Sequence, residues 1–217
     1  MISKYGYDVF FTVAALCGVV VVVAVVFVEP KFPRYGIVVS GLVLFLLTLN
    51  FFRDPERKPP EGDQHIVAPA DGRIVVVKEV EASDYLRGRV CQISIFMSPL
   101  NVHVNRNPVT GVVRHVRYVP GEFFAAFEDK ASEKNEQTII GVENLYGRVL
   151  FKQIAGFIAR RIVCSLDVGD SVKAGARFGM IKFGSRVDVF VPVDAVLKVK
   201  VGDSTVAGET VLADFRE

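Results

Sequence analysis

Two long apolar stretches dominate the start of the chain. Residues 9–28 and 35–52 carry no charged side chain and consist mainly of Val, Leu, Phe and Ala. Twenty helical residues span about 30 Å, the thickness of a bilayer core. Residues 29–34 contain two prolines, which are expected to break the helix. The pattern predicts a transmembrane helical hairpin; a cleavable signal peptide and a buried hairpin of a soluble protein are the alternatives.

The charges around these stretches predict an orientation. Lys4 precedes the first stretch, basic residues at positions 53, 57 and 58 follow the second, and the intervening loop carries Lys31 and Arg34. The positive-inside rule favours both ends of the hairpin on the cytoplasmic side of the cell (inner) membrane. Residues 53–64, rich in charge and proline, are typical of a stiff interfacial linker. The hairpin and linker together are therefore assigned to residues 1–64.

From residue 65 onward, apolar and polar positions alternate with a period of two, which is typical of strands. The predicted strands are 66–67, 73–78, 90–97, 100–108, 111–119, 138–143, 147–153, 157–164 and 180–190. Asp71-Gly72 separates two of these runs and predicts a hairpin turn. We expect a mainly β domain over residues 65–217.

An eight-residue repeat refines this fold. Residues 168–175 (VGDSVKAG) recur at 201–208 (VGDSTVAG), with six of eight positions identical. Gly-Asp and Ala-Gly turns joined by short strands suit a small barrel or sandwich. The repeat resembles the half-motif of biotinyl and lipoyl carrier domains, but the modifiable Lys in its usual context is absent. It therefore predicts a barrel-sandwich-like domain without carrier function.

Gly184-Ser185 interrupts the strand predicted at 180–190. A glycine and a hydroxyl stand where Val or Ile would pack better. One interpretation is a β-bulge followed by a polar strand residue. The other is a chain that cuts itself between Gly184 and Ser185.

Two further residues, His103 and Asp71, are candidates for chemistry. Period-two geometry places Asn101, His103 and Asn105 on one face of the strand 100–108. This face lies either in solvent or along a pocket in which His103 transfers protons. Asp71 is either a turn former or a catalytic carboxylate.

Composition excludes some classes of function. A net charge of +2 gives no sign of nucleic-acid binding. The three cysteines and three histidines have neither disulfide-framework nor metal-ligand spacing. No metal is therefore expected.

Taken together, the soluble part resembles phosphatidylserine decarboxylase in its short form with a membrane-embedded N-terminus. The resemblance covers about residues 65–217, and its order and spacing are specific. It rests on Ala68-Pro-Ala-Asp-Gly72, Phe96-Met-Ser-Pro-Leu-Asn-Val-His-Val-Asn-Arg106, Tyr118-Val-Pro-Gly121, Asn135-Glu136 and Phe183-Gly-Ser-Arg186.

The resemblance implies a proenzyme that cleaves itself between Gly184 and Ser185. A β chain, 1–184, and an α chain, 185–217, then stay associated, and Ser185 becomes a pyruvoyl group. The amine of phosphatidylserine is expected to form a Schiff base with this cofactor, giving phosphatidylethanolamine and CO₂. The family further implies proton transfer by His103 and a role of Asp71 in processing. Phosphatidylserine in the bilayer is the expected partner, and the oligomeric state, including a homodimer, is open.

Two positions depart from the family pattern. Some longer members carry a second His where this chain has Arg106, so a processing triad built on that His does not transfer. An Asn-Glu-Arg pattern reads Asn135-Glu136-Gln137 here, so a contact made by that Arg does not transfer either. The group that activates Ser185 is therefore left open.

Alternatives remain for one patch and for the whole chain. Phe123, Phe124 and Phe127 are either ordinary core or an apolar patch that reaches the acyl boundary. A membrane-anchored barrel-sandwich adaptor without catalysis explains the repeat and the hairpin, but neither the Gly-Ser break nor the face of His103. A pyruvoyl decarboxylase of a soluble amino acid leaves the hairpin unexplained.

Overall fold

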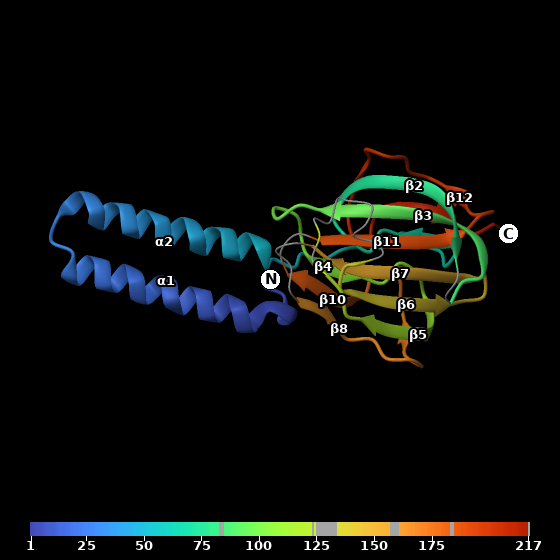
Figure 1. The fold of residues 1–217 in the computed structure, drawn as a ribbon, viewed down its shortest axis with the longest axis horizontal. Coiled ribbons are helices and arrows are strands. Elements are labelled where there is room, and N and C mark those ends of the chain that lie inside the picture. Colours follow the sequence, from blue (N-terminus) through green and yellow to red (C-terminus); the bar gives the residue numbers. More distant parts are fainter. Residues whose placement is uncertain (83–84, 123, 125–133, 157–160, 183–184, 217) are drawn as a thin grey trace. The chain divides into compact units, whose positions relative to one another are not determined.

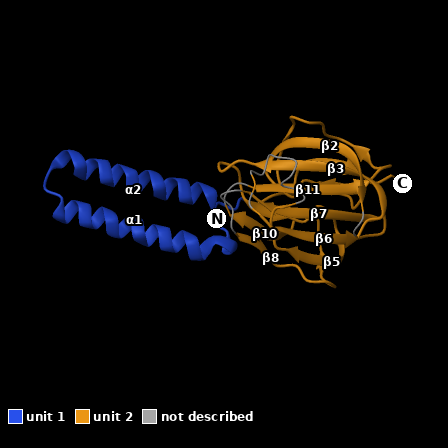
Figure 2. Ribbon diagram, in the orientation of Figure 1, with its two compact units in different colours: residues 1–55 blue, residues 56–217 orange. Residues whose placement is uncertain are grey.

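A computed structural model describes residues 1–217 except 83–84, 123, 125–133, 157–160, 183–184 and 217 (Figure 1). It divides into two compact units, Met1–Pro55 and Glu56–Glu217 (Figure 2). Residues 56–64 of the expected linker thus belong to the second unit.

The first unit is a pair of helices. After the short 3-10 helix η1 (Lys4–Gly6), α1 (Tyr7–Phe27) and α2 (Lys31–Phe51) run back along each other. Both are long and apolar enough to cross a membrane. Their exposed side chains are largely Val, Leu and Phe, a surface that suits lipid better than water.

The loop between the helices is shorter than the sequence suggests. It comprises only Val28, Glu29 and Pro30, because α2 already begins at Lys31. Pro33 lies in the first turn of α2, where backbone N–H groups have no partner within the helix, so its missing N–H breaks no hydrogen bond. The expectation that both prolines break the helix is therefore wrong for Pro33. Arg34 closes the loop, since its Nε donates to the Val28 carbonyl oxygen at 2.7 Å.

The second unit is a β domain, which confirms the predicted fold class. Eight strands form one sheet in the order β13-β2-β3-β11-β7-β6-β5-β9, and two three-stranded sheets have the orders β1-β14-β12 and β4-β10-β8. The strands are β1 (His65–Val67), β2 (Gly72–Ala82), β3 (Gly88–Met97), β4 (Val104–Arg106), β5 (Gly111–Val119), β6 (Gln137–Glu143), β7 (Arg148–Ala155), β8 (Arg161–Cys164), β9 (Ser171–Val172), β10 (Arg177–Lys182), β11 (Ser185–Pro192), β12 (Val196–Leu197), β13 (Ser204–Thr205) and β14 (Val211–Asp214).

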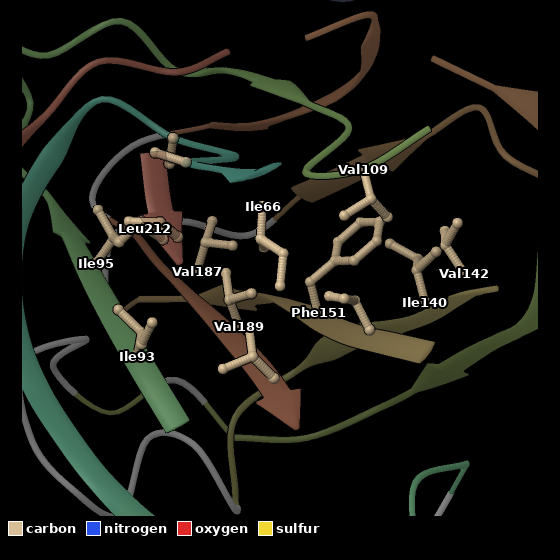
Figure 3. Close-up of a cluster of buried hydrophobic side chains, with 14 of the residues drawn as sticks. Ile66, Ile93, Ile95, Val109, Ile140, Val142, Phe151, Val187, Val189 and Leu212 are labelled. Carbon is tan, nitrogen blue, oxygen red and sulfur yellow. The ribbon is translucent and has the colours of Figure 1, made fainter. Parts of the chain in front are cut away.

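The core lies between the large sheet and the two small ones. Figure 3 shows Ile93 and Ile95 of β3, Val187 and Val189 of β11 and Phe151 of β7 directed into the same apolar cluster as Ile66 of β1. All of these side chains are buried. Complete burial of an aliphatic side chain of this size contributes about 1.5–3 kcal/mol. The cluster therefore fixes which face of each central strand points inward.

The repeat adopts the same structure twice. Gly169 and Gly202 have φ of 103° and 97°, and Gly175 and Gly208 have φ of 74° and 77°, a region that strongly favours glycine. Each copy of the repeat also hydrogen-bonds to a second segment at the equivalent position. The Gly208 N–H donates to the Ala68 carbonyl oxygen at 2.8 Å, and the Gly175 N–H donates to the Asn107 carbonyl oxygen at the same distance. The domain thus contains two similar half-motifs, more than the eight repeated residues indicate.

Asp71-Gly72 does not form the hairpin turn that the sequence predicts. The strand before it, β1, pairs with β14, and the strand after it, β2, pairs with β3 and β13. Glycine is needed for another reason, because a Cβ at Gly72 would lie 2.2 Å from the Phe96 carbonyl oxygen. A local turn signal could not reveal this close approach of a distant strand.

Candidate functional site

The interrupted strand divides between two sheets. β10 ends at Lys182 in a three-stranded sheet, and β11 begins at Ser185 in the eight-stranded sheet. Phe183 and Gly184 lie outside the described residues. The bond predicted to be cut therefore belongs to the connection between two sheets, and Ser185 is the first residue of a central strand.

Ser185 is completely buried although it begins a strand. It lies directly opposite Met97 of β3 on one side and Ala155 of β7 on the other. Its Oγ donates a hydrogen bond to Met97 Sδ at 3.1 Å. Because Val187 and Val189 share its face, the Ser185 side chain points into the sandwich.

A pair of buried amides adjoins this hydroxyl. Asn105 Nδ2 lies 3.9 Å from Met97 Sδ, and Asn105 Oδ1 accepts a hydrogen bond from Gln153 Nε2 at 2.9 Å. Gln153 lies opposite Val187, on the same face as Ser185. Its Oε1 is buried and has no hydrogen-bond partner among the described residues. Gln153 was missed in the sequence, because its place depends on strand register and no motif marks it.

His103 is completely buried, which excludes the solvent-facing alternative. Its Nδ1 lies 2.9 Å from the Asn101 carbonyl oxygen. A carbonyl can only accept, so Nδ1 donates to it, and in the neutral form of the ring Nε2 has the lone pair. Val104 pairs with Met180, which places His103 beside the end of β10, just before the predicted cleavage site. The side chain is thus a candidate base close to the junction.

The expected single face of Asn101, His103 and Asn105 is wrong in part. Only Val104–Arg106 forms a strand. Asn101 belongs to a turn, in which its Oδ1 accepts hydrogen bonds from the Ser98 N–H at 2.8 Å and the Ser98 hydroxyl at 2.9 Å. Ser and Asn compete for backbone bonds in this way, which ends the strand pattern.

Asp71 lies at the same end of the large sheet, two strands from Ser185, since Arg73 pairs with Phe96 and Phe96 with Arg186. Its Oδ1 accepts a hydrogen bond from the Ala207 N–H at 2.7 Å, and its Oδ2 pairs with Arg57 Nη2 at 2.9 Å. The hydrogen bond from the Ala207 N–H, in the turn of the second repeat, does not need a charged acceptor.

Thr110, the counterpart of Asp71 in the other half-motif, makes the same hydrogen bond with an uncharged side chain. Thr110 Oγ1 accepts a hydrogen bond from the Ala174 N–H at 3.2 Å, as Asp71 does from Ala207. The ion pair with Arg57 is what distinguishes Asp71 from its counterpart.

The residues that depart from the family pattern have structural contacts. Arg106 Nη1 donates to the Gly175 carbonyl oxygen at 2.9 Å and so supports a repeat turn. Gln137 lies opposite Ile154, on the face away from the Ser185 side chain.

Asn135, which matches the family pattern, supports the backbone of two other residues. Its Nδ2 donates to the Phe124 carbonyl oxygen at 2.8 Å and to that of Ala155 at 2.7 Å. Phe124 is half-buried, whereas Phe123 and Phe127 lie outside the described residues.

A buried polar cluster lies on the other face of β11, immediately after Ser185. Arg186 Nε donates to Asp188 Oδ1 at 2.6 Å, and Arg186 Nη2 donates to Ser94 Oγ at 2.7 Å. Gln92 Nε2 donates to Asp188 Oδ2 at 3.0 Å. Two opposite charges at i and i+2 in an otherwise apolar strand are the signal that could have revealed it. Removing one partner of such a pair is strongly destabilising, so the cluster fixes the start of β11.

The two cysteines of the β domain are poor nucleophiles. Burial raises the pKa of the Cys91 and Cys164 thiols, so both are protonated and weakly nucleophilic at neutral pH. Within the described part of the chain, no three His, Cys, Asp or Glu side chains gather as metal ligands.

Comparisons with known proteins identify the family of the chain. The family model for phosphatidylserine decarboxylase matches residues 44–213. A phosphatidylserine decarboxylase proenzyme of Chlorobium phaeobacteroides is 44% identical over 215 residues, 99% of this chain and 100% of the relative. One of Cytophaga hutchinsonii is 44% identical over 216 residues, 99% of this chain and 98% of the relative. One from strain BS1 of Chlorobium phaeobacteroides is 52% identical over 172 residues, 79% of each chain. The chain therefore belongs to the phosphatidylserine decarboxylase family, and this membership indicates a decarboxylase.

Proposed function

We propose that the chain cleaves itself between Gly184 and Ser185 and then converts phosphatidylserine to phosphatidylethanolamine and CO₂, using a pyruvoyl group made from Ser185. The observation that carries this proposal is the position of Ser185. It is a buried hydroxyl at the first residue of a central strand, next to a connection between two sheets, and His103 lies beside the end of β10, the strand before that connection.

The self-cleavage follows from the chemistry of Ser185. Its Oγ attacks the Gly184 carbonyl carbon, the C–N bond breaks, and the nitrogen leaves as an amine, so the amide becomes an ester. A base must take the hydroxyl proton, and His103 Nε2 is the candidate. β-Elimination then takes the Cα proton of residue 185, releases the carboxyl end of the β chain and leaves dehydroalanine. Water hydrolyses the imine tautomer of this residue to the pyruvoyl group, and the nitrogen leaves as ammonia. Glycine at position 184 leaves the attacked carbonyl unshielded.

The residues around Ser185 fit a pyruvoyl group. The α chain starts with β11, and this strand is held on one side by β3 and on the other by β7. The side chains on this face are buried, and Gln153 Oε1 is an acceptor without a hydrogen-bond partner among the described residues. When present, the group serves as an electron sink for loss of CO₂ from the bound substrate, in place of pyridoxal phosphate. His103 would hold the proton that replaces CO₂ on the substrate carbon.

The sheet topology supports lasting association of the two chains after cleavage. The α chain contributes β11 to the middle of the eight-stranded sheet, β13 to its edge and β14 to a small sheet with β1. Val187, Val189 and Val191 are fully buried. An α chain so embedded stays bound without a covalent link, because leaving would expose the core.

The helix pair supports a location in the cell membrane. A diacyl lipid leaves the bilayer only reluctantly, so an enzyme that acts on it gains from an anchor. The basic residues flanking the helices favour the β domain on the cytoplasmic side.

The purified full-length protein tests this function. Intact mass under denaturing conditions should show two fragments that divide at Gly184-Ser185, the smaller one resistant to Edman chemistry. Vesicles containing phosphatidylserine labelled at the serine carboxyl should release labelled CO₂ only with cleaved protein. A single 23.9 kDa chain without CO₂ release would refute the proposal.

Asp71→Thr tests whether the charge of Asp71 serves processing, as we propose. Thr110 shows that a threonine can support the equivalent turn, so the variant should fold while losing the ion pair to Arg57. We expect self-cleavage to stop or slow strongly, as followed by intact mass. Arg177→Ala is the control, since it removes an exposed pair to Glu56 in the same segment, worth roughly 0–1 kcal/mol. Normal cleavage by folded Asp71→Thr would restrict Asp71 to a structural role.

A further inference from the structure

The hydroxyl of Ser185 has an uncommon partner. Among the described residues, Met97 Sδ is the single hydrogen-bond partner of Ser185 Oγ. Both residues are completely buried and lie directly opposite each other on β3 and β11. A thioether is a weak acceptor, whereas most side-chain hydrogen bonds go to the backbone or water. The bond therefore orients the hydroxyl without holding it strongly.

The sulfur itself is held in place. Methionine has three rotatable bonds and adapts to irregular spaces, so Met97 alone would orient a partner poorly. Here Asn105 Nδ2 approaches Met97 Sδ at 3.9 Å, and Gln153 fixes Asn105 through the 2.9 Å bond to its Oδ1. All three side chains are fully buried. The amide pair thus gives the thioether a defined position.

We propose that Met97 is a positioning residue for self-cleavage. Its sulfur accepts the Ser185 O–H, which leaves the Oγ lone pairs available for the Gly184 carbonyl carbon. In that step the Oγ–C bond forms, the C–N bond breaks, and the hydroxyl proton passes through a base to the nitrogen that leaves. A thioether is not basic, so Met97 orients the hydroxyl and keeps no proton. This inference rests on the proposed function.

The chain contains a matched control. Met180 of β10 is also completely buried and lies opposite Val104 and Val163. Met97→Leu and Met180→Leu both replace a buried thioether by a side chain of similar volume, but only the first removes the partner of Ser185. The full-length chain is synthesised in the presence of detergent, and its cleaved fraction is followed over time by intact mass.

We expect Met97→Leu to slow cleavage roughly two- to tenfold, the range that loss of one hydrogen bond gives. Met180→Leu should cleave at the wild-type rate, with a thermal midpoint close to that of Met97→Leu. If Met97→Leu does not fold, norleucine incorporated for methionine into the Met180→Leu chain removes the sulfur at position 97 and keeps its shape. This protein should cleave more slowly than the methionine form of the same variant.

Two results would overturn the inference. One is cleavage of folded Met97→Leu, or of the norleucine protein, at the wild-type rate. The other is equal slowing by Met97→Leu and Met180→Leu, which would mean a packing effect. Failure of the proposed function looks different, because then the wild-type chain itself stays uncut.

Discussion

Ser185→Ala should yield one uncut chain of about 23.9 kDa that releases no CO₂ from phosphatidylserine. Alanine has no oxygen to attack the Gly184 carbonyl and cannot give rise to a pyruvoyl group, so processing and turnover should fail together. The fold should survive. The lost hydrogen bond goes to a sulfur, and a typical hydrogen bond contributes only about 0.5–1.5 kcal/mol. Intact mass, thermal unfolding and CO₂ release measure the three parts of this result.

Ser204→Ala provides the comparison. Ser204 is an exposed serine of the same α chain, on β13, and its loss should change neither cleavage nor activity. Cleavage of Ser185→Ala at the bond that the wild type cuts would show that the break does not need this hydroxyl. CO₂ release by an uncut Ser185→Ala chain would separate decarboxylation from the pyruvoyl group.

Several features could be predicted because their signals are local. The helix pair follows from uncharged runs long enough to cross a bilayer. The two copies of the repeat carry glycines at the positions where φ is positive. The division of the strand predicted at 180–190 was also visible, since a flexible glycine and a serine hydroxyl interrupt its apolar pattern. In each case, the residues that produce the feature lie next to one another in the chain.

The surroundings of Ser185 could not be predicted in the same way. Met97 and Gln153 reach the site because β3 and β7 pair with β11 in one register, and a shift of one residue would turn their side chains to the other face. The hairpin expected at Asp71-Gly72 failed for a related reason, because its flanking strands pair with distant segments. Non-local pairing, rather than local propensity, decides which side chains meet Ser185.

His103→Asn should lower the rate of decarboxylation per cleaved chain by roughly 10²–10⁴-fold, the usual contribution of a positioned acid or base. Asparagine is a more specific substitution than alanine, because its amide can still donate to the Asn101 carbonyl oxygen that His103 Nδ1 contacts at 2.9 Å. The buried turn keeps its hydrogen bond, but the lone pair of Nε2 is gone. Rates should be normalised to the cleaved fraction by intact mass, so that loss of processing and loss of turnover are counted separately.

His115→Asn is the matched control for this residue. His115 lies on β5, where its ring stacks on Tyr85 at 5.8 Å between ring centroids. Among the described residues, the hydrogen bonds of Ser185, Asn105 and Gln153 given above do not involve it. Its replacement should leave the rate per cleaved chain unchanged. Because His103, unlike His115, lies beside the end of β10, the rates of the two variants should differ by roughly 10²–10⁴-fold. Equal rates in cleaved His103→Asn and His115→Asn would assign the protonation of the substrate carbon to another group.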